Sequence, residues 1–374
     1  MDVIDLFAGV GGFSSGFRKA GYNILLANEI DKDIAASYSK NHPETRMIND
    51  DIKNILPQVK GLKGKVEVII GGPPCQGFSM AGARIRTNKG SEFLDDPRNY
   101  LFRHYFAVVQ EVEPQFFVME NVPGMLSMQD GKIVEEIERL FSDEKNFANG
   151  RYYLYKQVLD AHDYGVPQDR HRLIIFGSKK KLDFKKLFKE VRDEMISSGE
   201  IEMHTIGDAI SDLNWLESGE GEFKQSYKEQ PLTKYQKERR KECEILHNHV
   251  ATKHNEVAIS RIKELQPGGR RLDLAEGSNI KSVHSGAYGR MRWDESSKTI
   301  ITRFDTPSSG VYIHPERHRT LTPREAARIQ SFDDDFVFYG NKSSVIKQIG
   351  NAVPPLLAYY LAKVIEKART INED

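Results

Sequence analysis

The chain has few of the features that stabilise or anchor proteins outside the cytoplasm. Only two of its 374 residues are cysteines, Cys75 and Cys243, and they are far apart in the sequence. A disulfide framework and a cysteine-based zinc cluster are therefore excluded. The N-terminus has no basic segment followed by a long apolar stretch, and no uncharged apolar run reaches the length of a membrane span. We expect a soluble protein of a reducing, cytoplasmic compartment.

An excess of charge of either sign is also lacking. The 54 Lys and Arg residues balance 54 Asp and Glu residues, which is not typical of a protein held to nucleic acid by bulk electrostatics. Residues 1–150 are net acidic and the rest net basic, with basic runs at 234–241, 270–271 and 317–328. Taken singly, such a run is more often a solvated face than a DNA contact.

Short apolar runs alternate with amphipathic stretches over the first 180 residues, which predicts a doubly wound α/β domain with a largely parallel sheet. We predict strands near Val3–Phe7, Ile24–Ala27, Val66–Ile70, Phe116–Met119 and Leu173–Phe176. We predict helices near Phe13–Ala20, Lys32–Lys40, Asn99–Val112 and Lys132–Phe141.

The periodicity weakens between about 180 and 318, where charge, Gly and Ser increase and a smaller, less regular domain is expected. Helix signals return at Thr322-Pro323-Arg324-Glu325, which has a capping-box spacing with Pro at the first helical position. A last helix follows Pro354-Pro355. Its apolar face needs a partner, and we expect it to pack on the first domain.

A Gly-rich turn, residues 8–12 (AGVGG), follows the first strand and lets the backbone approach a ligand closely. The turn alone is a weak signal, and its spacing is not that of dinucleotide sites. Glu29 ends the second strand, where α/β sites hold the two hydroxyls of a ribose. Asp51 is placed to accept from an adenine amine, although a solvated acidic turn explains it equally well. An adenosine-bearing ligand suits this edge, and the phosphate-poor loop favours S-adenosylmethionine over NAD.

A reactive thiol is predicted after the third apolar run. Residues 71–79 read GGPPCQGFS, so two prolines stiffen the loop before Cys75 and glycines let it bend around a planar substrate. This polar loop favours a nucleophile over a packed apolar cysteine. Glu120 ends another buried strand at the same edge and is a candidate proton donor. In an extended segment Gln168, Arg170 and Arg172 share one face, which either is solvated or binds a pyrimidine oxygen and a phosphate.

With these pieces in place, the chain closely resembles the cytosine-5 DNA methyltransferase family. The matching blocks occur in family order and leave only about 180–318 without a strong motif. They are DLFAGVGGF at 5–13, NEID at 28–31, DDI at 50–52, GGPPCQGFS at 71–79, DPRNYLF at 96–102, ENV at 120–122, QDRHR at 168–172, RTLTPREAARIQSF at 319–332 and QIGNAVPP at 348–355.

The resemblance implies a role for individual residues. Cys75 is the nucleophile, Glu120 holds and protonates the cytosine ring nitrogen, and Arg170 and Arg172 orient the base and adjoining backbone. The implied contacts of S-adenosylmethionine, which leaves as S-adenosylhomocysteine, are Phe7, Ala8, Gly9, Val10, Gly11, Gly12, Glu29, Ile30, Asp51, Ile52, Pro74, Leu101, Asn351 and Ala352. Candidate DNA contacts are Gln76, Ser79, Asn121, Gln168, Arg270, Arg271, Arg290, Arg292 and Arg303.

The resemblance also implies a division of labour. Residues 1–180 and 320–374 form a Rossmann-like catalytic domain that binds the cofactor, and 181–319 form the target recognition domain. The expected substrate is a cytosine flipped out of double-stranded DNA, because the base cannot be reached inside the duplex. We expect no metal, a monomer in the cytoplasm at the nucleoid, and possible pairing with a restriction endonuclease that acts on the same site without a stable complex.

Four other readings compete with this one. A cytosine-5 tRNA methyltransferase shares most motifs, but a variable region of this size favours DNA, since sequence readout needs its own surface. A non-catalytic DNA-binding relative is disfavoured by the intact Cys75, Glu120 and cofactor motif. A zinc deaminase needs a second cysteine after two intervening residues and an upstream His-x-Glu, but here Gln76-Gly77-Phe78 follows Cys75. A NAD oxidoreductase leaves the Cys75 loop unexplained.

Overall fold

The computed structural model describes residues 1–74, 100–241, 243–275, 280, 282, 284 and 286–371. By its internal packing the chain divides into two compact units. The first comprises Met1–Asp160, His171–Ile201 and Pro355–Asp374, and the second comprises Ala161–Arg170 and Glu202–Pro354. These bounds differ from the predicted ones because 161–170 and 320–354 pack within the second unit. The functional roles of the two predicted domains stay a prediction.

A seven-stranded sheet forms the centre of the first unit, in the order β3-β2-β1-β4-β5-β8-β6. Its five parallel strands are β1 (Asp2–Leu6), β2 (Asn23–Asn28), β3 (Arg46–Ile48), β4 (Val68–Gly71) and β5 (Phe116–Asn121). The other two, β8 (His171–Ser178) and β6 (Tyr153–Asp160), form antiparallel pairs, β5 with β8 and β8 with β6. The α/β fold class is confirmed, but β8 runs against its neighbours.

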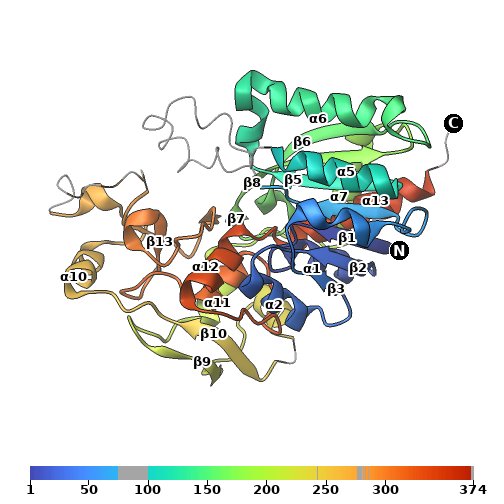
Figure 1. Ribbon diagram of the computed structural model, residues 1–374. Helices are drawn as coiled ribbons and strands as arrows, with labels where there is room; N and C mark the ends of the chain where they lie inside the picture. The colour runs from blue at the N-terminus through green and yellow to red at the C-terminus, as the bar shows by residue number, and fades with distance from the viewer. Residues whose placement is uncertain are drawn as a thin grey trace. The chain divides into compact units, whose positions relative to one another are not determined.

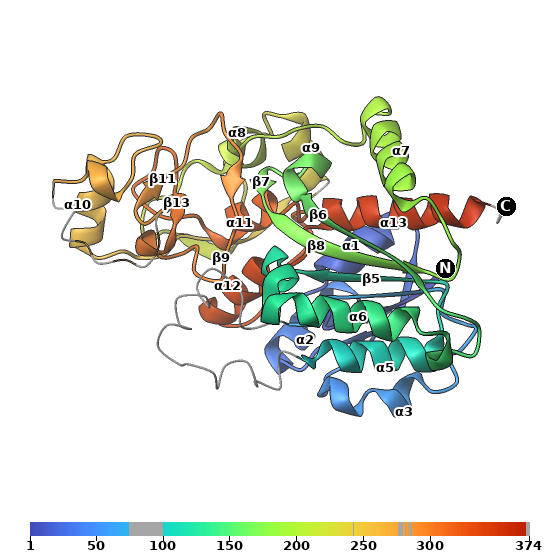
Figure 2. The same ribbon diagram turned by 90° about the horizontal axis from the view of Figure 1, so that it is seen from above.

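Helices cover both faces of this sheet (Figures 1 and 2). One face carries α5 (Phe102–Val112) and α6 (Lys132–Ser142), with the short α3 (Leu56–Val59) beside α5. Side chains of these helices form one large apolar core with Ile4 and Leu6 of β1. The other face carries α1 (Gly12–Lys19), α7 (Phe184–Ser197) and α13 (Pro355–Thr370), while α2 (Lys32–Asn41) links β2 to β3. Burial on both faces explains why the parallel strands appear as continuous apolar runs.

The predicted strands and helices of the first unit are all present within a few residues of their predicted bounds. The prediction missed β3, β6 and α7. Strand β3 has only three residues, and the edge strand β6 leaves Lys156, Gln157 and Val158 exposed. Neither therefore contains the continuous apolar run on which the prediction relied.

The predicted C-terminal helix is confirmed as α13, and it packs against α1. The Tyr22 hydroxyl donates to the Ala362 carbonyl at 3.0 Å, which fastens the turn after α1 to the same helix. Gly16 makes the close approach possible, because a Cβ at that position would lie 2.4 Å from the Ala358 Cβ and from the Pro355 oxygen.

The second unit is less regular, as predicted for most of its length. Its helices are α8 (Ile206–Ile210), α9 (Lys234–Arg240), α10 (Glu256–Glu264), α11 (Pro323–Ile329) and α12 (Lys342–Asn351). Its strands form three pairs, β9 (Gly221–Ser226) with β10 (Ile245–Val250), β11 (Gly289–Arg290) with β13 (Val311–Ile313), and β7 (Gln168–Asp169) with β12 (Ser297–Lys298). The predicted capping box opens α11, with the Thr322 amide donating to Glu325 at 2.8 Å.

The basic run at 317–328 is mostly part of the core of this unit. Arg319, Arg324 and Arg328 are fully buried. Arg319 pairs with Glu325 at 2.7 Å, and Arg328 pairs with Asp334 at 2.7 Å and with Asp212 at 2.5 Å. For these three arginines, both a solvated face and a DNA contact are therefore wrong.

Among the residues that the structure describes, no helix is long and apolar enough to cross a membrane.

The α1–α13 contact gives a first prediction. Gly16→Ala should lower the free energy of unfolding by about 1 to 3 kcal/mol, because the added methyl group overlaps backbone that cannot easily move. Thermal denaturation measures the effect. Ser39→Ala, at an exposed position of α2, is the control and should leave Tm nearly unchanged. Equal Tm values for Gly16→Ala and the wild type would contradict the proposed close packing.

Candidate active site

The turn between β1 and α1 has an unusual backbone. Phe7, Gly9 and Gly11 all have positive φ angles, of 56°, 56° and 98°. A Cβ on Gly11 would lie 2.5 Å from the His42 ring nitrogen, so only glycine fits there. Above Gly9, by contrast, a Cβ would meet no atom within 4 Å. The His42 ring thus packs closely against the turn at Gly11, whereas the space beside Gly9 is open.

Glu29, at the end of β2, holds this turn. Its carboxylate accepts from the Gly9 amide at 3.0 Å and from the Asp31 amide at 2.8 Å. The neighbouring Ile30 is an apolar side chain with 66% of its surface exposed. The Asn49 side chain connects the segment after β3 to the segment after β2. It donates to the carbonyls of Glu29 and Ile30 at 2.9 and 3.1 Å.

The other predicted cofactor residues of the first unit follow the same edge of the sheet. Asp51 caps a short 3₁₀ turn by accepting from the Lys53 amide at 3.0 Å, and its side chain remains accessible. Ile52 is buried in the core, Leu101 precedes α5, and Pro74 is exposed after β4. Asn351, which ends α12, and Ala352 belong to the second unit. Their predicted contact with the cofactor stays a prediction.

Cys75, Gln76 and Ser79 lie outside the described residues, but the segment that leads to Cys75 is defined. Asn121, at the end of β5, is buried and donates to the Pro73 carbonyl at 2.8 Å. Its side-chain oxygen accepts from the Val122 amide at 2.9 Å. In the structure Asn121 joins the end of β5 to Pro73 after β4, and its predicted DNA contact stays a prediction.

Glu120 and Arg172 form an ion pair beside that loop. The Arg172 Nε lies 2.6 Å from Glu120 Oε1, and the two side chains are 12% and 13% exposed. Glu120 Oε2 would lie 3.1 Å from a Cβ on Gly72, three residues before Cys75. Burial lowers the pKa of the Arg172 guanidinium, and the Glu120 carboxylate partly offsets this. An acidic and a basic side chain therefore meet, nearly buried, at the ends of adjacent strands.

Arg170 and Gln168 have their polar groups bonded inside the second unit. Arg170 is 1% exposed and donates to the carbonyls of Ile300, Gly350 and Ala352 at 2.9 to 3.0 Å. Gln168 donates to the Gln330 side chain at 2.8 Å and accepts from the Ile300 amide at 2.7 Å. This bonding favours a structural role for both, and their predicted contacts with the base and the DNA stay predictions.

Comparison with known proteins identifies the family. A family model described as C-5 cytosine-specific DNA methylase matches residues 1–367. The chain belongs to this family. It is 37% identical to the Type II methyltransferase M.DdeI of Desulfomicrobium norvegicum, covering 100% of this chain and 91% of the relative. It is 36% identical to the Type II methyltransferase M1.HphI of Haemophilus parahaemolyticus, covering 99% and 88%. The protein is a DNA cytosine-5 methyltransferase.

Solved structures agree with the fold. A putative DNA modification methyltransferase encoded within an Escherichia coli prophage superposes with a TM-score of 0.74 at 26% identity, covering 99% of this chain and 100% of that chain. The S. pombe Dnmt2 methyltransferase, at 15% identity, shares the fold with a TM-score of 0.61, covering 98% and 99%. The predicted Rossmann-like architecture is confirmed.

The predicted DNA-contacting arginines of this methyltransferase have different environments. Arg290 is buried and donates to the carbonyls of Ile262 and His314 at 2.7 and 2.9 Å, so it is not accessible. Arg271 donates to the Ile280 carbonyl at 2.6 Å. Arg292 is exposed but paired with Asp294 at 2.9 Å. Arg270 and Arg303 are exposed. Base or phosphate contacts at these positions stay predictions.

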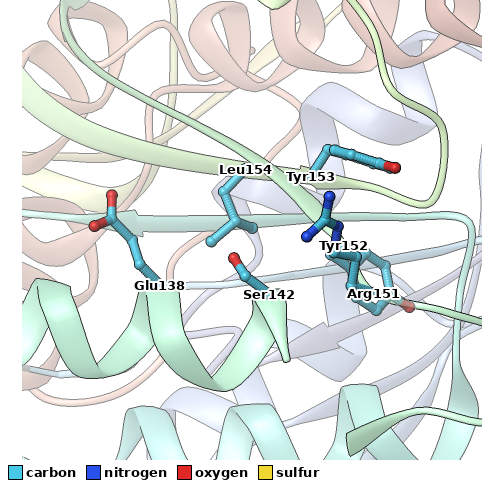
Figure 3. Close-up of a pocket in the computed structure, with 6 residues that line it drawn as sticks. All are labelled: Glu138, Ser142, Arg151, Tyr152, Tyr153 and Leu154. Carbon is cyan, nitrogen blue, oxygen red and sulfur yellow. The ribbon is translucent and has the colours of Figure 1, made fainter. Parts of the chain in front are cut away.

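A cavity beside α6 has a different lining from the predicted site. It has a volume of about 330 Å³ and is lined by Glu138, Ser142 and residues 151–154 (Figure 3). None of the predicted catalytic or cofactor residues lines it, so we assign it no part in the reaction.

Sequence reasoning missed Asp5, a carboxyl in the middle of β1 with only 1% of its surface exposed. Ser14 donates to it at 2.6 Å. Burial raises the pKa of Asp5 from 3.8 to about 7, and the nearby Glu29 carboxylate adds to the rise, whereas Ser14 opposes it. The available signal was an acid between the apolar residues Ile4 and Leu6 of the run DVIDL.

This raised pKa gives a pH-dependent prediction. The folded protein holds the Asp5 proton more tightly than the unfolded chain does, so the stability that protonation contributes is complete below pH 4 and is lost as the pH rises to about 7. Relative to Asp5→Asn, the wild type should lose at most about 4 kcal/mol over this range. Urea denaturation of both proteins from pH 4 to 8 measures the difference. Parallel stability curves would show that Asp5 titrates normally.

Proposed function

We propose that this DNA cytosine-5 methyltransferase transfers a methyl group from S-adenosylmethionine to a flipped-out cytosine in one short double-stranded DNA sequence. A transient bond between Cys75 and C6 of the cytosine would activate the ring. The observation that carries the proposal is the Glu120–Arg172 pair, which lies beside the Gly72 backbone, three residues before Cys75.

The turn between β1 and α1, residues 7–11, is here called the cofactor turn, and its features are compatible with S-adenosylmethionine. The Glu29 carboxylate stands where a ribose would bind, the exposed Ile30 offers an apolar surface to a purine ring, and Gly9 leaves open space. Asp51 is available to accept from an exocyclic amine. When bound, S-adenosylmethionine supplies the methyl group as an electrophile.

The chain's own groups would activate the cytosine. C5 is a poor nucleophile, but addition of the Cys75 thiolate to C6 converts the ring to an enamine whose C5 can attack the methyl group. Glu120 would hold N3 and give it a proton, which stabilises the negative charge that the addition creates. Arg172 would keep the Glu120 carboxyl in position. Loss of the C5 proton to water, expulsion of the Cys75 thiolate and return of the N3 proton to Glu120 would then restore the aromatic ring.

A role in restriction and modification is supported by the relatives, which are named Type II methyltransferases. We propose that the enzyme acts as a cytoplasmic, nucleoid-associated monomer. It would share its DNA site with a restriction endonuclease without forming a stable complex with it.

The nucleophile can be tested with the two cysteines as a matched pair. Bisulfite sequencing of a plasmid from cells that express the wild type should reveal 5-methylcytosine in one short sequence. Cys75→Ala should abolish the signal, whereas Cys243→Ser, in the second unit, should retain it.

The covalent step has its own readout. DNA containing 5-fluorocytosine should form a denaturant-resistant adduct with the wild type, because fluorine cannot leave as the C5 proton does. An enzyme that methylates DNA but never forms this adduct does not use the covalent mechanism.

A second test concerns Glu120. Glu120→Gln keeps the shape of the side chain but removes its charge and its acidic proton, so kcat should fall roughly 10²- to 10⁴-fold. The control is Glu138→Gln on α6, which loses only an ion pair with Lys156 and should keep wild-type kcat. If both variants turned over at the wild-type rate, Glu120 would not be the proton donor.

A further inference from the structure

We propose that Asp5, Ser14 and Tyr38 form a positioning network that fixes the cofactor turn and so sets the affinity for S-adenosylmethionine without touching the reacting atoms. The inference rests on the proposed use of that cofactor. It concerns residues that the proposed reaction does not otherwise employ.

The network is a short chain of hydrogen bonds in the interior. Asp5 lies on β1, Ser14 on α1 and Tyr38 on α2, and all three are buried. The Ser14 hydroxyl donates to Asp5 Oδ2 at 2.6 Å and lies 2.7 Å from the Tyr38 hydroxyl. When Asp5 is ionised, Ser14 gives its single proton to Asp5, and the Tyr38 hydroxyl then donates to Ser14. The order Tyr38 to Ser14 to Asp5 therefore uses each proton once.

The three side chains connect the elements that border the turn. The turn leaves β1 after Asp5 and enters α1 before Ser14, so the Ser14–Asp5 bond closes it at its base. The Tyr38 ring packs against Ala8 within the turn, and a Cβ on Gly11 would lie 2.8 Å from that ring. The positive φ of Phe7 needs such support, because the left-handed conformation is costly for a residue other than glycine unless its surroundings impose it.

The network is poorly explained by stability alone. Asp5 is a buried acid flanked by the apolar Ile4 and Leu6, and its Oδ1 is buried without a hydrogen-bond partner among the described residues. An unsatisfied buried oxygen lowers stability, so an apolar residue at this position would serve packing better. An apolar residue could not supply the acceptor that Asp5 Oδ2 provides for the Ser14 hydroxyl. This favours a role in holding Ser14, and through it the turn.

The test compares steady-state kinetics of single variants. Asp5→Ala, Ser14→Ala and Tyr38→Phe each remove one link and should raise the KM for S-adenosylmethionine roughly three- to tenfold, the effect of one buried hydrogen bond. Their kcat and their KM for DNA should stay within about twofold of wild type. Asp5→Asn keeps an acceptor for Ser14 and should restore the cofactor KM.

The matched control is Tyr152→Phe, which removes another buried tyrosine hydroxyl, one that donates to the Pro114 carbonyl before β5. It should lower Tm as Tyr38→Phe does but leave the cofactor KM unchanged. An unchanged KM in both Ser14→Ala and Tyr38→Phe would overturn the inference, as would an equal rise in Tyr152→Phe. If Asp5→Ala fails to fold, those two variants decide the matter. A wild type without S-adenosylmethionine-dependent methylation would instead refute the proposed function.

Discussion

The parallel pairing of β1 to β5 is the constraint on which the rest of the first unit depends. Because these strands run in one direction, the segments that follow them all begin at the same edge of the sheet. Glu29 follows β2, Asp51 follows β3, the Gly72 loop follows β4, and Glu120 ends β5. Residues separated by almost a hundred positions in the sequence thereby lie along one edge of the sheet.

Buried charge is used differently in the two units. In the second unit, Arg328 is compensated by Asp212 and Asp334, and Arg319 by Glu325, so these charges hold irregular segments together through paired hydrogen bonds. In the first unit, Asp5 accepts from a neutral donor, Ser14, rather than from a charged one. Burial raises the pKa of Asp5, and perturbed ionisable groups cluster at functional sites.

The sequence was sufficient to predict most of the first unit, because buried parallel strands leave apolar runs and their ends carry the Gly-rich and acidic segments. It was also sufficient for the capping box before α11. It was not sufficient for β6, whose exposed edge has no apolar run, nor for the direction of β8, since an apolar run carries no information about strand direction. The environment of an arginine could not be predicted from the sequence either. Arg290 and Arg328 look like surface charges in the sequence, and only the fold reveals the carbonyls and carboxylates that surround them.

The reversed direction of β8 determines where Arg172 lies. Arg172 is the second residue of this eight-residue strand, and β8 pairs with β5 so that Asn121 is opposite Leu173. If β8 ran parallel to β5, its start would lie at the opposite edge, about 20 Å away at the usual rise per residue. Because β8 is antiparallel to β5, Arg172 near the N-terminal end of β8 lies beside Glu120 near the C-terminal end of β5. The distance between Glu120 and Arg172 is then set by the backbone hydrogen bonds between β5 and β8 rather than by a loop. This pairing makes the two residues a rigid element, which redesign of the surrounding loops should leave in place.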